Sequence, residues 1–132
     1  MKIAVLYTLT AAIFLVLDAV MLKLHMQPLF RRALGDQLLT DIRMAPAAGF
    51  YLAYVAGLIF LVSLPALKTG SAVVVPAAII GAMAYGTYEF TSYAIMNAWN
   101  PQMVITDLIW GTFLTAFSAW AGVVLTRLIF KG

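Results

Sequence analysis

The sequence contains no cysteine, one histidine and only five acidic residues in 132. The lack of cysteine excludes disulfides, c-type haem attachment and thiolate metal sites. Charged residues make up 10% of the chain and hydrophobic residues 64%, and the mean hydropathy is +1.01. A water-soluble domain of this size would have too little polar surface to cover its core. We therefore expect an integral membrane protein.

Four apolar stretches each approach the roughly 20 residues that a helix needs to cross a bilayer. They lie at about 3–24, 46–67, 71–95 and 104–127. Short turns follow the second and third stretches, whereas a longer segment with most of the loop charge follows the first. The sequence predicts an all-α fold in which residues 1–132 form a single transmembrane domain, an integral membrane four-helix bundle.

The segment between the first two stretches contains "PLFRRALGDQLL", in which apolar residues alternate with charged ones at helical spacing. This pattern predicts a short amphipathic surface helix within residues 26–43. Arg31 and Arg32 are expected to contact lipid headgroup phosphates, and His25 to mark the water interface. The net charge of +3 is spread along the loops, so no nucleic-acid surface is expected.

Three acidic residues, Asp18, Glu89 and Asp107, lie inside the apolar stretches. Each would cost roughly 2.5–3.5 kcal/mol near the centre of a transmembrane helix, so each needs a partner, water or a proton. Asp18 and Glu89 both lie about six residues before the end of their stretch, and Asp107 lies near the start of the fourth. In an up-down bundle all three carboxyl groups therefore lie in one leaflet, on the side of the long connection.

Helical periodicity gathers aromatic and hydroxyl side chains on the same faces as these acids. The residues that we expect to form a site are Asp18, Tyr51, Tyr54, Tyr85, Tyr88, Glu89, Ser92, Asp107 and Trp110. On the fourth stretch Asp107 begins a stripe of small and polar residues that continues through Gly111, Thr115, Ser118 and Gly122. Turning these faces inward produces a pocket of carboxylates and phenols that opens toward one leaflet.

Two further patterns have structural interpretations. Gly49, Ala53 and Gly57 recur at four-residue spacing, which predicts close approach of the second helix to a neighbour. Trp99 follows the third stretch, and a tryptophan near a helix end is expected to belong to the interfacial aromatic belt.

The predicted pocket suits a small amphiphilic ligand. Its carboxylates would attract a cation, and its aromatic rings would contact that cation through their faces. Burial and mutual repulsion favour the neutral form of at least one acid near neutral pH, and Glu89 is our choice because no basic residue is near it in sequence. The first hypothesis is therefore ligand binding or transport, coupled to a proton.

Two other classes remain open. The same carboxyl groups and phenols would serve a membrane-embedded enzyme acting on a lipid or fatty chain, with the two arginines holding the headgroup. Alternatively, the chain is an accessory subunit whose acids face another membrane protein, or it forms a homo-oligomer. No catalytic residues, cofactor or metal ligands are assigned, because no nucleophile elbow, phosphate-binding loop or diagnostic ligand spacing is present.

The sequence also resembles a bacterial family of predicted membrane proteins known as domain of unknown function 2177. The resemblance rests on "FLVLDAVML", "FRRALG", "FYLAYVAGL", "AYGTYEFTSYAIMNAW" and "TDLIWGTFLT". Glu89 stands where many members have Asp, and Met21 where a Trp is common. The resemblance implies four membrane helices in a bacterial inner membrane and brings no activity with it.

Overall fold

The computed structural model describes residues 2–21, 23–24 and 44–131. These residues form helices joined by short turns, and no strand occurs among them, so the all-α prediction is confirmed for this part of the chain. The predicted surface helix, with His25, Arg31 and Arg32, lies outside the described residues. The elements are α1 (Lys2–Met21), α3 (Met44–Leu58), η3 (Ile59–Ser63), α4 (Leu64–Thr69), α5 (Val74–Ile95) and α6 (Pro101–Lys131).

The second apolar stretch is one continuous helical segment whose middle, η3, is a π-helix. The Leu64 N–H group bonds to the Ile59 carbonyl, five residues back. Pro65 follows directly, and its ring lacks an N–H donor and crowds the preceding turn, so a wider turn at this point relieves the clash. The segment ends at Gly70, which adopts a φ of 75° and donates its N–H to the Ala66 carbonyl.

The turn between α5 and α6 is defined by side-chain capping. The Asn100 side-chain oxygen accepts a hydrogen bond from the Met103 N–H at 3.0 Å, as an N-cap residue does. Pro101 occupies the first helical position, where its fixed φ favours the helix and its missing N–H is not needed. This start makes α6 begin a few residues earlier than the predicted fourth stretch.

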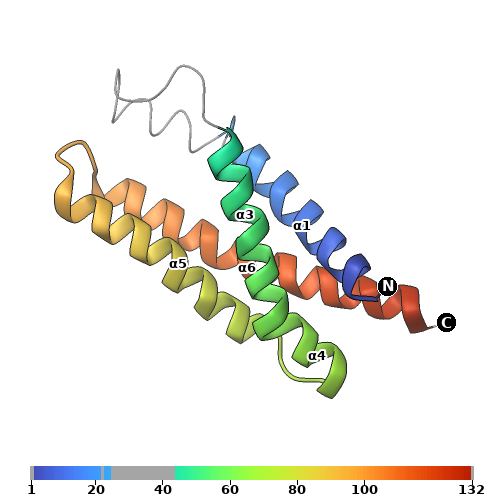
Figure 1. Ribbon diagram of the computed structural model, residues 1–132. Coiled ribbons are helices and arrows are strands. Elements are labelled where there is room, and N and C mark those ends of the chain that lie inside the picture. The colour runs from blue at the N-terminus through green and yellow to red at the C-terminus, as the bar shows by residue number, and fades with distance from the viewer. Residues whose placement is uncertain (1, 22, 25–43, 132) are drawn as a thin grey trace.

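Two helices lie along α6, and a third crosses it. Figure 1 shows α5 beside the first half of α6 and α1 beside the second half, with α3 passing over the middle. The chain termini lie at one end of the molecule, together with α4, and the α5–α6 turn lies at the other end. Arg127 links α6 to α4, because its guanidinium donates a 2.8 Å hydrogen bond to the Ala66 carbonyl.

Glycine allows α5 to approach α6 closely. A methyl group at Gly81 would lie 2.7 Å from the Gly111 carbonyl oxygen and 2.9 Å from the Thr115 side chain. Since a Cβ atom cannot occupy that space, the backbones at this crossing are in direct contact. A similar contact joins α1 to α6, where a methyl group at Gly122 would meet the Thr10 hydroxyl.

Within the described part of the chain, three segments are long and apolar enough to cross a membrane: Lys2–Met21, Ala48–Thr69 and Pro101–Phe130. Large apolar side chains cover their outer faces, among them Val16, Phe60 and Ile109. The interior, in contrast, contains fully buried hydroxyl groups. An apolar exterior around a partly polar interior is the arrangement expected of a protein in lipid.

The α5–α6 contact gives a test of the packing. Gly81→Ala should destabilise the protein by about 1–3 kcal/mol, because the new methyl group meets a backbone carbonyl that cannot move aside. The measurement is thermal unfolding of the purified protein in detergent.

Gly57→Ala is the matched control, since nothing lies within 4 Å of the new methyl group and this position is exposed. It should be neutral or stabilising by up to about 1 kcal/mol through helix propensity. Equal melting temperatures for the two variants would contradict the packing described here.

Candidate functional site

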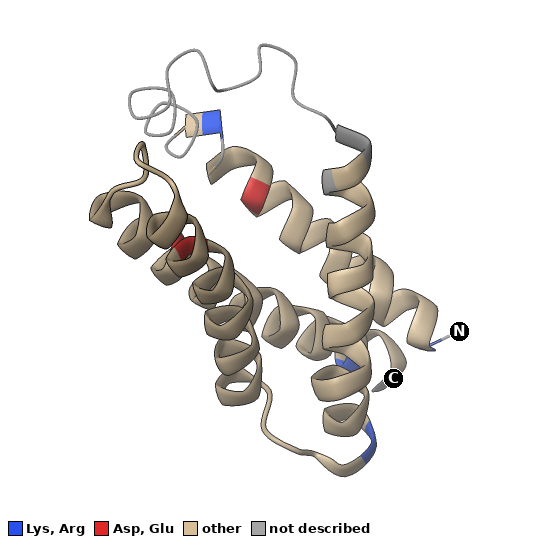
Figure 2. Ribbon diagram, turned by 60° about the vertical axis from the view of Figure 1, so that its left-hand side comes forward, with Lys and Arg blue, Asp and Glu red and all other residues tan. Residues whose placement is uncertain are grey.

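The three acids of the apolar helices lie in the same half of the molecule. Figure 2 shows the acidic residues in the half that holds the α5–α6 turn, whereas most described Lys and Arg residues lie near the termini and α4. Asp18 comes from α1, Glu89 from α5 and Asp107 from α6. We call these three residues the carboxylate cluster.

Glu89 is the most deeply buried member of the cluster. Its side chain is 0% exposed, and its Oε1 atom accepts a 2.8 Å hydrogen bond from the indole N–H of Trp99. Trp99 lies in the turn after α5 and folds back over the helix, where its ring meets the edge of Tyr88 at 5.9 Å. The other oxygen of Glu89, Oε2, is buried and has no donor among the described residues.

Asp107 faces Glu89 across the α5–α6 interface. It is 8% exposed, and its carboxyl group lies within hydrogen-bonding reach of the Glu89 carboxyl group. Two ionised carboxylates offer only acceptors, so a hydrogen bond between them requires a proton on one of them. The pair is therefore a place where one proton can be held between two residues.

Asp18 forms the more open side of the cluster. It is half-buried, and its Oδ1 atom accepts a 3.1 Å hydrogen bond from the Trp110 indole N–H. The Tyr51 hydroxyl lies close enough to donate to the same carboxylate. Asp18 thus has a donor from α6, lies near Tyr51 of α3 and is only partly buried.

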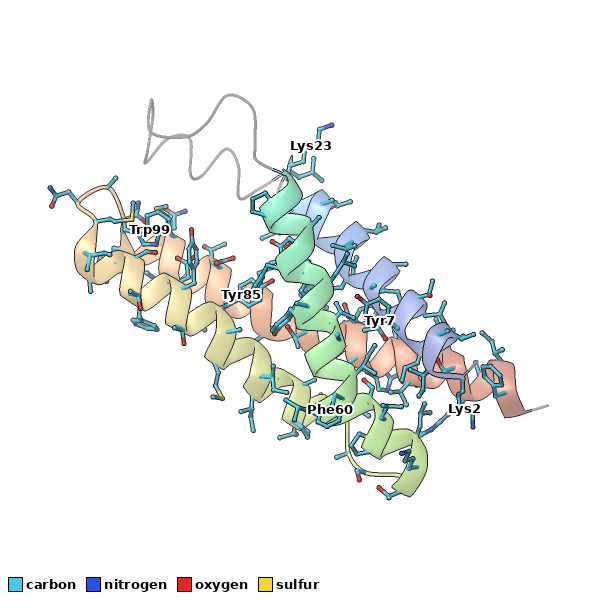
Figure 3. All side chains as sticks on the ribbon, in the orientation of Figure 1. Lys2, Tyr7, Lys23, Phe60, Tyr85 and Trp99 are labelled. Carbon is cyan, nitrogen blue, oxygen red and sulfur yellow. The ribbon has the colours of Figure 1, made fainter. Side chains whose placement is uncertain are left out.

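Aromatic side chains line the space between α1, α3 and α5. The Phe14 ring packs against Tyr51 at 5.7 Å and against Tyr54 at 5.6 Å between centroids. Tyr54 in turn meets the edge of Tyr85 at 6.5 Å, and Figure 3 shows Tyr85 pointing from α5 toward α3. The Tyr85 ring lies directly on Gly111, where any side chain would displace it. Its hydroxyl is buried and has no partner among the described residues.

The described residues around the cluster include no basic side chain bonded to it. In the described part of the chain, no Lys or Arg forms an ion pair with any of the three acids. Within the same residues, no three His, Asp or Glu side chains are grouped closely enough to hold a metal ion. Among the described residues, the printed hydrogen bonds to these acids therefore come from neutral indole N–H groups.

The structure brings most of the predicted site residues together. Asp18, Tyr51, Tyr54, Tyr85, Glu89, Asp107 and Trp110 surround one region, as their contacts show. Ser92 is 9% exposed and lies one turn beyond Glu89 on the same face. Tyr88 is 53% exposed and reaches the site only through its contact with Trp99.

Two sequence-based interpretations were wrong. Trp99 is not an interfacial belt residue, since it is 7% exposed and bonds to Glu89. The short turn after α5 could have indicated the bond to Glu89. It brings Trp99 back beside Glu89, although the two residues are ten positions apart. Gly49, Ala53 and Gly57 do not form a close helix contact, because all three are exposed and no atom lies near either glycine.

The comparisons with known proteins place the chain in context. The family model described as Predicted membrane protein (DUF2177) matches residues 3–124. This range contains every residue of the site and all of the described helices except the ends of α1 and α6. No curated protein and no solved structure matches the chain.

Trp99 gives a test of the site. Trp99→Phe removes the one donor that the described residues offer to a fully buried carboxyl oxygen, so it should destabilise the protein by about 1–3 kcal/mol. Trp110→Phe should cost less, because Asp18 is only partly buried and water can replace the lost donor. The measurement is thermal unfolding in detergent.

Trp120→Phe serves as the control, since Trp120 is 46% exposed and faces outward. Its effect should stay within about 0.5 kcal/mol. A Trp99→Phe protein as stable as the control would show that the bond to Glu89 contributes nothing.

Proposed function

The chain belongs to this family of predicted membrane proteins, and from that premise we propose that its carboxylate cluster binds a small amphiphilic cation within the membrane in exchange for a proton. The observation that carries the proposal is the proximity of fully buried Glu89 to Asp107, with no basic partner among the described residues. An acid in this position is costly in lipid, and such acids usually mark ion or substrate pathways.

The proposal places α5 in the membrane as the fourth helix of the bundle. α5 is not among the three segments that are apolar enough by composition. The polar residues that reduce its hydropathy include Glu89 and Ser92, and both face the interior. Its outward side chains, such as Met83 and Phe90, are apolar. The backbone of α5 also touches α6 at Gly81, and α6 is long enough to span a membrane. We therefore place α5 beside α6 within the bilayer.

The residues around Asp18 fit a cation with apolar groups. The Asp18 carboxylate supplies the opposite charge at the half-exposed side of the cluster. Tyr51 and Trp110 both reach this carboxylate and present aromatic rings beside it. Aromatic faces attract organic cations by about 0.5–2 kcal/mol each, and more strongly where water is excluded.

The inward direction of the acids distinguishes this function from that of an accessory subunit. A subunit that recruits a partner through charge would expose its acids on an outer surface. Glu89 and Asp107 are instead buried between α5 and α6. Their charges are therefore directed at something that enters the chain's own interior.

Exchange with a proton follows from charge balance. The Glu89–Asp107 pair holds a proton when no cation is present, because the two carboxyl groups contact each other. A bound cation near Asp18 supplies positive charge to the same region, so the proton leaves more easily. Binding of one cation is thereby linked to release of one proton.

The proposal predicts pH-dependent binding. Tetraphenylphosphonium should bind the purified protein more tightly as pH rises, by up to about tenfold per pH unit where one proton is displaced. Glu89→Gln should remove most of this pH dependence, since an amide cannot release a proton. Asp18→Asn should weaken binding at every pH by at least about tenfold. Isothermal titration calorimetry in detergent measures all three effects.

Tyr93→Phe is the control, because Tyr93 is 46% exposed on the outer face of α5. Its affinity and its pH dependence should match those of the unmodified protein. An affinity that does not change with pH, or a Glu89→Gln protein with unchanged pH dependence, would refute the exchange.

A further inference from the structure

Buried hydroxyl groups continue from the carboxylate cluster toward the other end of the molecule. One face of α6 carries Asp107, Gly111, Thr115, Ser118, Gly122 and Thr126, and every one of them is buried. At 1.5 Å per residue, the stretch of α6 from Asp107 to Arg127 is about 30 Å long, which is the thickness of a bilayer's hydrocarbon core. A polar face of this length reaches from one side of a membrane to the other.

The neighbouring helices add hydroxyl groups to this face. The Tyr54 hydroxyl of α3 lies 2.9 Å from the Thr115 hydroxyl, and Tyr54 meets the edge of Tyr85. The Tyr85 hydroxyl is buried in the same region as Asp18 and Asp107. The first half of the face therefore leads from the carboxylate cluster to Thr115 through phenol groups.

The second half of the face holds two hydroxyl groups that have no partner. Ser118 and Thr10 are both 0% exposed, and neither side chain makes a hydrogen bond within the described residues. Thr10 projects from α1 onto Gly122, one helical turn beyond Ser118. Thr126 follows one turn later and bonds to the Gly122 carbonyl at 2.7 Å. Beyond it lies exposed Arg127.

These unpartnered hydroxyls differ from those of several helical threonines in the described part of the chain. Thr87, Thr112 and Thr126 each donate to the carbonyl four residues back, which satisfies the hydroxyl within its own helix. Thr10 and Ser118 do not, although an unsatisfied hydroxyl in an apolar interior costs about 1–3 kcal/mol. Their donors and acceptors are thus left available for water or for each other.

We propose that Tyr54, Thr115, Ser118 and Thr10, with single bridging waters, form a proton relay from the Glu89–Asp107 pair to the membrane face near Arg127. Successive turns of α6 are about 5.4 Å apart, a gap that one water spans with two hydrogen bonds. Each hydroxyl or water accepts one proton and passes on its own, so no charge remains and no bond other than O–H changes. This relay rests on the proposed function, because it gives the released proton a path to the opposite side.

The charged and titratable groups at the two ends are known. The carboxylate end is faced by Asp18 of α1, Tyr51 of α3, and Tyr85 and Tyr88 of α5. The other end carries Arg127, which donates to Ala66, and Lys2, whose ammonium lies 5.8 Å from the Phe130 ring centroid. Between the ends, the described residues that lie on the path carry neutral tyrosine, serine and threonine hydroxyls.

Proton flux into proteoliposomes tests the relay. Pyranine trapped inside reports internal pH after an external pH step, with potassium and valinomycin holding the membrane potential at zero. The unmodified protein should carry protons faster than protein-free vesicles. Thr10→Val and Ser118→Ala should each reduce this flux at least fivefold, whereas Thr10→Ser, which keeps the hydroxyl, should retain it.

Thr112→Val is the matched control on α6, since its hydroxyl already bonds to the Leu108 carbonyl and lies off the buried face. Its flux should equal that of the unmodified protein. Flux that is unchanged in Thr10→Val and Ser118→Ala, equally reduced in Thr10→Ser, or absent from the unmodified protein would overturn the relay.

Binding of tetraphenylphosphonium to the same variants separates the relay from the proposed function. Thr10→Val and Ser118→Ala should bind the cation with unchanged affinity, because neither residue belongs to the carboxylate cluster. Reduced flux with normal binding supports both proposals. Hydroxyl-dependent flux in a protein that binds no cation supports the relay and refutes the proposed ligand.

Discussion

The contact between Glu89 and Asp107 is the constraint on which the rest of the site depends. Two carboxyl groups enclosed between α5 and α6 can hydrogen-bond only if they share a proton, and no described cation lies beside them to take its place. Their separation is set by the close approach of the two helices, which glycine at position 81 permits. Gly111 extends the same contact by leaving room for the Tyr85 ring. The packing of α5 against α6 therefore determines how closely the two carboxyl groups approach, and thus whether they can share a proton.

The sequence was sufficient for the all-helical character of the described residues, and it led to the expectation that the acids gather. Long apolar stretches and a 3.6-residue period place Asp18, Glu89 and Asp107 at one depth and on facing stripes, because both quantities follow from the geometry of a single helix. The small and polar stripe of α6 was likewise predicted from the spacing of its residues along one helix. These predictions needed no knowledge of how neighbouring helices cross.

The remaining features depend on how the helices cross and on the geometry of the turns. Neither can be derived from the periodicity of a single helix. The stripe of Gly49, Ala53 and Gly57 predicts contact, yet α3 crosses the bundle on its opposite face, through Tyr54 and Val55. Nothing local to α3 distinguishes a packing stripe from an exposed one. Trp99 was missed for a related reason, since its side chain folds back over α5 only because Asn100 and Pro101 start the next helix at once. Turn geometry, not helix periodicity, decides that contact.

In the proposed exchange, the contacts of Glu89 would let a proton leave without loss of the bond to Trp99. The Oε1 atom accepts the Trp99 N–H, so a proton on that oxygen would weaken the bond. The Oε2 atom has no donor and is therefore the oxygen left for a proton shared with Asp107. When the proton departs, Oε1 remains an acceptor and gains negative charge, which strengthens its bond to Trp99. The indole thus stabilises the ionised pair at the moment when repulsion between the two carboxylates is greatest. A single tryptophan in a turn would thereby support both protonation states that the proposed exchange involves.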